Sequence, residues 1–250
     1  MIPLFKVFMD KDVMIPLADT IHSGMITQGK KVEEFEEQLS NFFSDPCASH
    51  TPYVLTLNSA TAGLTLALHM LKSEVNFDDE QDIVLTPALT CFATTAAILS
   101  QKVNIRWIDV DPNTSNISLD DLEQKLNCHT KIIYLVHWGG SPVDLGRLSQ
   151  ILDCFEEKHG FRPRVVEDCA HAFGAEYDGK KLGNHGNICV FSTQAIKHLT
   201  TGDGGIIILP NKELYERCKL LRWYGINRDK RNYNRKDLRL ENDITEWGYK

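Results

Sequence analysis

Residues 53–71 read YVLTLNSATAGLTLALHML, a stretch that contains a short apolar run, a turn of small polar residues and a helical pattern in that order. The apolar run at 53–57 predicts a buried strand, and residues 62–71 predict a helix. The turn at 58–61 lies where the helix begins, and the first N–H groups of a helix have no partner within it. The stretch therefore predicts a strand-to-helix unit with an anion-binding turn, although small polar turns are common and this signal is weak alone.

Short apolar runs and helical patterns continue to alternate along the rest of the chain. Further strands are predicted at 82–86, 104–110, 131–136, 163–167, 188–191 and 205–209. Helices are predicted at 32–42, 94–99, 118–123, 145–155 and 213–221, with Ser118 as an N-cap. The strands are uniformly apolar, which is typical of strands buried on both faces. We therefore expect an α/β fold with a mostly parallel sheet sandwiched by helices.

Polar or reactive residues follow several of the predicted strands. They are Ser59, Ala60, Thr61, Cys91, His137, Asp168 and Ser192. Ligands of open parallel sheets bind beyond the carboxyl ends of the strands. We therefore expect these residues to converge on one shared site.

Residues 191–205 read FSTQAIKHLTTGDGG and place the amine of Lys197 among hydroxyls and glycines. Most lysines are solvated surface charges. Here, however, the lysine follows a buried-looking strand, and a partly buried amine is suited to forming a Schiff base with an aldehyde cofactor. Lys197 is therefore a candidate catalytic residue that binds pyridoxal 5'-phosphate (PLP) and moves protons between cofactor and substrate.

Asp168 ends the predicted strand at 163–167 and precedes His171. A carboxylate here could pair with the pyridinium nitrogen of PLP, or it could simply cap the segment that follows. A lone histidine is more often a core residue, but beside Asp168 His171 could contact the ring. Ser192 and the turn at 59–61 suit a phosphate group. Cys91 could lie against the ring, whereas Phe92 is expected to pack in the core.

Composition excludes several classes of function. The 250 residues are 42% hydrophobic and 24% charged, and the net charge of −7 disfavours nucleic-acid binding. No apolar run approaches the roughly 20 residues that span a membrane. The seven cysteines are scattered without a C-x-x-C pair, so we expect no metal site, no disulfide framework and a cytoplasmic protein with reduced thiols. Cys169 and Cys189 are expected in the core.

These residues resemble the DegT/DnrJ/EryC1/StrS family of PLP-dependent nucleotide-sugar aminotransferases, within the fold-type I (aspartate aminotransferase-like) class. The resemblance covers nearly the whole chain in order. Its motifs are TQGKKVEEFE (27–36), NSATAGL (58–64), TPALTCFAT (86–94), DVDPNT (109–114), HWGG (137–140), EDCAHAFGA (167–175), the Lys197 run and RWYGI (222–226).

The resemblance implies a role for each residue of the site. Lys197 would be the Schiff-base lysine, Asp168 the partner of the pyridine nitrogen, and His171 a neighbour of the ring. Ser192 would bind the phosphate by its hydroxyl, and Ala60 and Thr61 by their N–H groups. Such enzymes take an amino group from glutamate and pass it to a keto carbon of a nucleotide-linked sugar. The resemblance points to a perosamine-synthase-like, 4-keto-6-deoxy sugar substrate and to a homodimer in deoxyamino-sugar and polysaccharide biosynthesis.

The sequence departs from the family in two places. Many relatives have an aromatic ring where Cys91 stands. Relatives also continue, from a segment like Trp247-Gly248-Tyr249-Lys250, into a smaller C-terminal domain that helps cover the substrate. We therefore expect an N-terminal arm at 1–30 and a PLP-binding large domain at 31–250, without the small C-terminal domain.

Two other functions remain open from the sequence. A deoxy-sugar dehydratase of the same family would carry histidine at the lysine position, so Lys197 argues against it, although His198 is adjacent. The chain could also be a truncated, non-catalytic remnant that acts as an interaction module.

Overall fold

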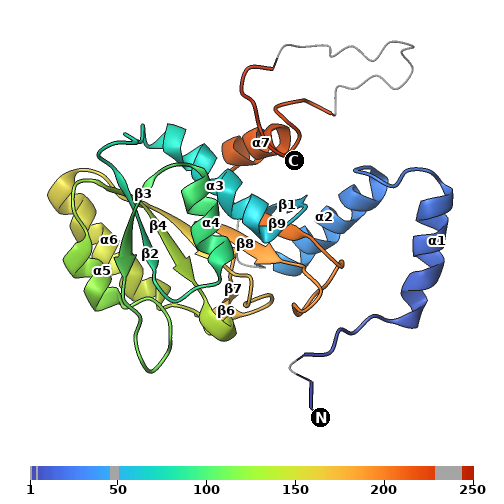
Figure 1. Cartoon of the computed structure of the whole chain (residues 1–250), viewed down its shortest axis with the longest axis horizontal. Coiled ribbons are helices and arrows are strands. Elements are labelled where there is room, and N and C mark those ends of the chain that lie inside the picture. The colour runs from blue at the N-terminus through green and yellow to red at the C-terminus, as the bar shows by residue number, and fades with distance from the viewer. Residues whose placement is uncertain (1, 4, 46–50, 229–243) are drawn as a thin grey trace.

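A central β-sheet organises the computed structural model, which describes residues 2–3, 5–45, 51–228 and 244–250 (Figure 1). Seven strands form this sheet within the described residues. They are β1 (Tyr53–Leu57), β2 (Ile83–Pro87), β3 (Asn104–Ile108), β4 (Thr130–Val136), β5 (Arg164–Asp168), β8 (Ile188–Ser192) and β9 (Gly205–Leu209). Their order across the sheet is β1-β9-β8-β5-β4-β2-β3.

The sheet is mostly parallel, as the sequence predicts. The pairs β2–β3, β2–β4, β4–β5 and β5–β8 are parallel, whereas β9 runs antiparallel to both β8 and β1. Consequently β1, β2, β4, β5 and β8 all point the same way. Their carboxyl ends lie along one edge of the sheet, where ligands of such folds bind.

Helices cover both faces of the sheet. One face carries α2 (Lys30–Phe43), α5 (Leu119–Lys125) and α6 (Leu145–His159), and the other carries α3 (Ala60–Glu74), α4 (Phe92–Ser100) and α7 (Lys212–Leu221). Side chains alternate between the two cores along each strand, so that Ile133 packs with α6 and the next residue, Tyr134, packs with α3. These two layers bury the apolar runs that identified the strands.

The predicted elements all occur, with small differences at their ends. α3 begins at Ala60 rather than at Ala62, because Ser59 caps it: the Ser59 hydroxyl accepts the Ala62 N–H at 3.1 Å. Ser118 likewise caps α5 through the Asp121 N–H. The structure also contains short elements that the sequence did not reveal, namely η1 (Lys11–Val13), α1 (Met14–His22), η2 (Trp138–Gly140), β6 (Glu176–Tyr177) and β7 (Lys180–Lys181).

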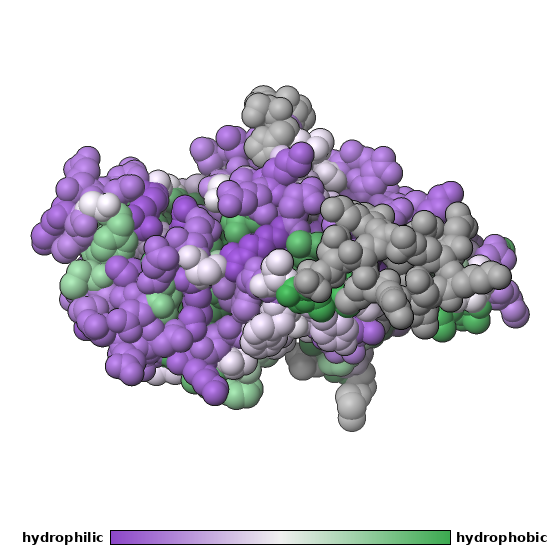
Figure 2. Space-filling model, turned by 90° about the horizontal axis from the view of Figure 1, so that it is seen from above, coloured by the Kyte–Doolittle hydropathy of each residue, from purple (hydrophilic) through white to green (hydrophobic). Residues whose placement is uncertain are grey.

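The N-terminal segment stands apart from the sheet and its helices (Figure 1). Neither η1 nor α1 has a buried residue, yet α1 exposes large apolar side chains such as Ile15 and Leu17. Figure 2 shows hydrophobic groups at the surface towards the right-hand end, where this segment lies. The residues that the structure describes include no helix that is both long and apolar enough to cross a membrane.

Candidate functional site

The start of α3 and the end of β8 meet through Gly205. Gly205 pairs with Ser192 across β8 and β9. A Cβ atom on Gly205 would lie 2.4 Å from the carbonyl carbon of Ser59 and 2.5 Å from the nitrogen of Ala60. Only glycine permits this approach, which brings the end of β8, where Ser192 lies, near the first turn of α3. The structure therefore brings together the residues Ser59, Ala60, Thr61 and Ser192 that the sequence predicts for phosphate binding.

Asp168 is the last residue of β5 and is only 4% exposed. Its Oδ1 accepts the N–H of Ala170 at 3.0 Å, and its Oδ2 accepts the hydroxyl of Thr94 at 2.6 Å. Asp168 pairs with Val190 on β8, two residues before Ser192. The buried carboxylate thus lies at the end of the strand next to β8, which ends at Ser192, and its side chain is fixed by two donors.

His171 lies within electrostatic reach of both Asp168 and Lys197. Burial, followed by the positive charge of Lys197, holds the pKa of His171 below its ordinary value, although Asp168 acts in the opposite direction. The Gly139 N–H donates to Nδ1 at 3.4 Å, which fits a neutral imidazole. The ring also contacts Trp138, with the ring centres 5.5 Å apart. Asp168 and the loop that carries Lys197 thus follow neighbouring strands, β5 and β8, and both charges act on the His171 imidazole.

Lys197 lies in the loop between β8 and β9 and is half-buried. The Lys197 N–H donates to the Gln194 carbonyl at 2.9 Å. The base of the loop is closed by the Thr193 and Thr201 hydroxyls, which are 2.8 Å apart. Gly204 makes this closure possible, because a Cβ there would lie 2.4 Å from the Thr193 hydroxyl. The glycines and threonines around Lys197 therefore shape the loop that presents the amine.

Cys91 and Phe92 are exposed, whereas Asp168 is buried. Cys91 is the exposed N-cap of α4, one turn before Thr94. The prediction that Phe92 packs in the core is wrong, because its side chain is 72% exposed. The first turn of α4 reaches the open edge of the sheet, so a residue there can be large and apolar without being covered by this chain.

His137 follows β4, as predicted, but its side chain turns into the interior and is fully buried. Its Nε2 lies 2.8 Å from Glu167, and its Nδ1 accepts the Val143 N–H at 3.0 Å. The second contact leaves Nδ1 without a proton, so Nε2 donates to the carboxylate. His137, Glu167 and Cys169 form a compact buried cluster. Cys169 and Cys189 are core residues, as predicted. His137 therefore does not open onto the site.

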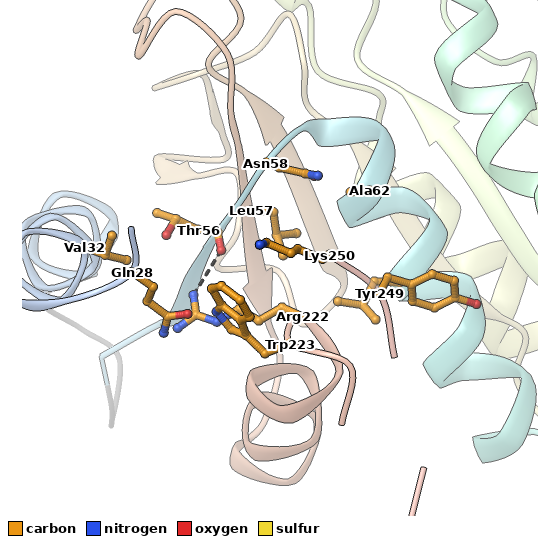
Figure 3. Close-up of a pocket in the computed structure, with 11 residues that line it drawn as sticks. Gln28, Val32, Thr56, Leu57, Asn58, Ala62, Arg222, Trp223, Tyr249 and Lys250 are labelled. Atoms are coloured by element: carbon orange, nitrogen blue, oxygen red, sulfur yellow. Dashed lines mark hydrogen bonds between the residues drawn. The ribbon is translucent and has the colours of Figure 1, made fainter. Parts of the chain in front are cut away.

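A pocket lies beside the start of α3, between α2, β1 and α7 (Figure 3). Polar and aromatic groups that line it include Gln28, Asn58, Arg222, Trp223, Tyr249 and Lys250. Arg222 donates to the Thr56 carbonyl at 3.0 Å, as the dashed line in Figure 3 marks. The Lys250 amine lies over the Trp223 ring, 4.7 Å from its centre. No acidic side chain is among the described residues that line this pocket, but Arg222 forms an ion pair with Glu36 of α2, which leaves Lys250 as the cation that favours an anion there.

The segment 244–250 builds one wall of this pocket. The Tyr249 N–H donates to the Leu221 carbonyl at 2.7 Å, and Glu246 accepts from both His69 and Arg217. A Cβ on Gly248 would lie 2.1 Å from the Leu221 carbonyl oxygen. The glycine therefore allows the segment to pack directly on the end of α7. This segment has neither the helical nor the strand periodicity of apolar residues. Its packing on α7 instead depends on individual residues, Glu246, Gly248 and Tyr249.

Thr94 and Gly205 are site residues to which the sequence analysis gave no role of their own. Thr94 appears in a predicted helix and at the end of the motif at 86–94, but a buried hydroxyl on a helix carries no spacing signal that would give it a role. Gly205 lies at the end of a glycine-rich run, a signal that predicts a turn rather than a contact between two elements.

Comparisons with known proteins identify the family. The model of the DegT/DnrJ/EryC1/StrS aminotransferase family matches residues 8–249. GDP-perosamine synthase from Escherichia coli O157:H7 is 34% identical over 200 residues, which are 80% of this chain and 50% of that protein. The sugar aminotransferase CalS13 from Micromonospora echinospora superposes with a TM-score of 0.88 at 43% identity, over 100% of this chain and 63% of that one.

A third similar structure is the PLP form of a protein described as a sugar aminotransferase, Spr1654 from Streptococcus pneumoniae. It superposes with a TM-score of 0.83 at 28% identity, over 100% of this chain and 62% of that one. The chain thus spans 50% to 63% of the length of these relatives. The family match covers nearly the whole chain, and the chain belongs to the DegT/DnrJ/EryC1/StrS aminotransferase family.

Proposed function

We propose that the chain forms the cofactor-binding part of an enzyme that transfers the amino group of glutamate to a keto carbon of a nucleotide-linked sugar, of the 4-keto-6-deoxy type. The observation that supports this best is that Asp168 and the loop carrying Lys197 follow neighbouring strands, β5 and β8, while Gly205 brings the start of α3 against the same edge of the sheet. The cofactor of this family is PLP. The similarity to a GDP-perosamine synthase supports the choice of sugar.

The residues present fit PLP. The Gly205 contact brings the start of α3 close to the end of β8, so the first N–H groups of α3 and the Ser192 hydroxyl could together bind a phosphate dianion. Asp168 has a lone pair left on each oxygen after its two hydrogen bonds, so it can accept a ring N–H. Cys91, at the start of α4, would face the ring from that side. When bound, PLP withdraws electrons from the carbon that loses or gains the amino group.

The side chains of the chain then have separate tasks. Lys197 holds the aldehyde, and its Nζ afterwards accepts and returns the proton that moves during transfer. Asp168 keeps the ring nitrogen protonated, and neutral His171 offers Nε2 towards the ring. The cation Lys250 favours an anionic substrate in the neighbouring pocket, whereas Arg222 is paired with Glu36.

We also propose that residues 31–250 form the large domain of the enzyme and that two copies associate through the N-terminal arm at 1–30. The exposed apolar side chains of α1 support this assembly, since a short helix without tertiary contacts gains stability when a partner covers its apolar side chains.

The activity can be tested by mass spectrometry of products from a panel of keto-sugar nucleotides with glutamate and PLP. The proposal predicts an amino sugar and 2-oxoglutarate, both lost in Lys197→Ala and retained in Lys158→Ala, which alters an exposed lysine at the far end of α6. A deoxygenated product without amino transfer would instead indicate the dehydratase. No turnover of any substrate in the panel would favour a non-catalytic module.

A further inference from the structure

A chain of two threonine hydroxyls ends on the Asp168 carboxylate. Thr94 is fully buried in α4, and its hydroxyl lies 2.6 Å from Asp168 Oδ2. The hydroxyl of Thr90 lies 2.7 Å from that of Thr94. In the described residues, the only other hydrogen bond to this carboxylate comes from the Ala170 N–H.

The direction of these hydrogen bonds follows from the chemistry of the groups. An ionised carboxylate only accepts, so Thr94 must donate its single proton to Asp168. Thr94 can then only accept from Thr90, and both O–H dipoles point towards the carboxylate. The distance of 2.6 Å is in the range of charge-assisted O–H···O⁻ bonds.

The two donors also fix the orientation of the carboxylate. Ala170 holds Oδ1 from the segment after β5, while Thr94 holds Oδ2 from α4, which is distant in sequence. The side chain of Asp168 therefore cannot rotate without breaking a hydrogen bond in a nearly dry site. The Thr94 N–H in turn donates to the Cys91 carbonyl at 3.1 Å, so one helical turn connects Asp168 with position 91.

We infer that Thr94 is a positioning residue for the cofactor, with Thr90 as its support: it aims the Asp168 carboxylate so that a ring N–H can be accepted. This inference rests on the proposed function. The Thr94 side chain takes no part in the transfer itself and acts only through Asp168. An apolar residue of the same shape at position 94 would leave Oδ2 buried and unpaired.

The test is PLP affinity, measured by titrating the full chain with PLP and following the visible absorbance of the bound cofactor. Thr94→Val, which preserves shape, should bind PLP about tenfold or more weakly, as expected for a lost hydrogen bond to a charge. Thr94→Ser, which restores the hydroxyl, should bind within about threefold of wild type. Thr90→Val should show a smaller loss, because Thr94 can still donate.

Thr95→Val is the matched control, since Thr95 is the next residue of α4 and makes no described hydrogen bond to Asp168. It should match wild type both in affinity and in the pH at which the bound-cofactor band loses half its intensity. Thr94→Val should shift that pH, an effect that loosened packing alone would not produce. Thermal melting checks that each variant is folded, and if Thr94→Val is not, Thr90→Val and Thr94→Ser carry the test.

The outcomes separate this inference from the proposed function. If wild type binds PLP through Lys197 and Thr94→Val binds it equally well with the same pH dependence, the role of Thr94 is wrong and the function stands. If wild type binds no PLP, both are wrong.

Discussion

His171 shows how burial and neighbouring charges set the pKa of a side chain in the candidate site. Burial and the Lys197 amine both oppose a second positive charge, and they keep the pKa of His171 low despite Asp168. The same neutral imidazole accepts the Gly139 N–H. The histidine is therefore set to act as a hydrogen-bonding group rather than as a cation near neutral pH.

This state predicts a pH effect on the stability of the cofactor-free protein. In the unfolded chain, histidine takes up a proton near pH 6.5, whereas in the folded chain His171 takes it up only at lower pH. Between those values the unfolded state binds more protons, so the free energy of unfolding falls as pH falls below about 6.5. His171→Gln should lose less stability than wild type between pH 7.5 and pH 5.5 in urea unfolding.

The control is His22→Gln, which changes an exposed histidine of α1 and should follow wild type. An unchanged acid dependence in His171→Gln would show that burial and Lys197 do not act on this imidazole as described.

The sequence could predict the residues that act at the ends of strands, but not how each side chain turns. Lys197, Asp168 and Ser192 follow apolar runs, and a parallel sheet brings those ends together. His137 has the same position in its strand, yet it turns into the core, because Glu167 and the Val143 N–H offer it partners there. Such partners come from distant parts of the chain and leave no local pattern.

Among the elements, β9 makes a close approach to the start of α3. The contact at Gly205 connects the strand that follows the Lys197 loop with the helix whose N–H groups would hold a phosphate. The antiparallel direction of β9 creates this contact. Apolar runs cannot reveal strand direction, so the sequence predicted the strand at 205–209 with its correct bounds but not its contact.

Gly205→Ala should therefore damage both stability and cofactor binding. Its Cβ would meet backbone atoms, which cannot move aside as a flexible side chain can, so we expect a loss of about 3 kcal/mol in the free energy of unfolding. The PLP affinity of the folded fraction should also fall. Urea denaturation and PLP titration would measure the two effects.

Gly29→Ala is the comparison for this change. Its Cβ would lie no closer than 3.6 Å to its neighbours, and Gly29 is the N-cap of α2, so a cost below about 1 kcal/mol is expected. Equal effects of the two substitutions would mean that the contact between β9 and α3 is not close.

At the level of the whole molecule, the N-terminal arm is the part that this chain leaves uncovered. The sequence did not predict α1, because no face of that helix packs against the sheet or its helices and its apolar residues follow no single stripe. We expect a second copy of the chain to bury those side chains.

Charges on this surface should prevent association. Ile15→Asp combined with Leu17→Asp should shift the protein from dimer to monomer in analytical ultracentrifugation, because these side chains are 72% and 50% exposed in the single chain. The expected weakening is about tenfold or more for each residue. Circular dichroism should remain that of wild type, since α1 contributes nothing to the core.

Asp19→Asn, on the same helix, should leave the dimer intact. A wild-type chain that sediments as a monomer, or a double variant that still sediments as a dimer, would contradict the role given to the arm.

The most direct test of the account is to find which lysine binds the cofactor. The full chain would be incubated with PLP, reduced with borohydride, digested and analysed by peptide mass spectrometry. We predict one pyridoxyl group on Lys197, in the peptide between β8 and β9, and no pyridoxyl group on any other residue at equimolar PLP. Labelling of another lysine, or no labelling at all, would contradict the account.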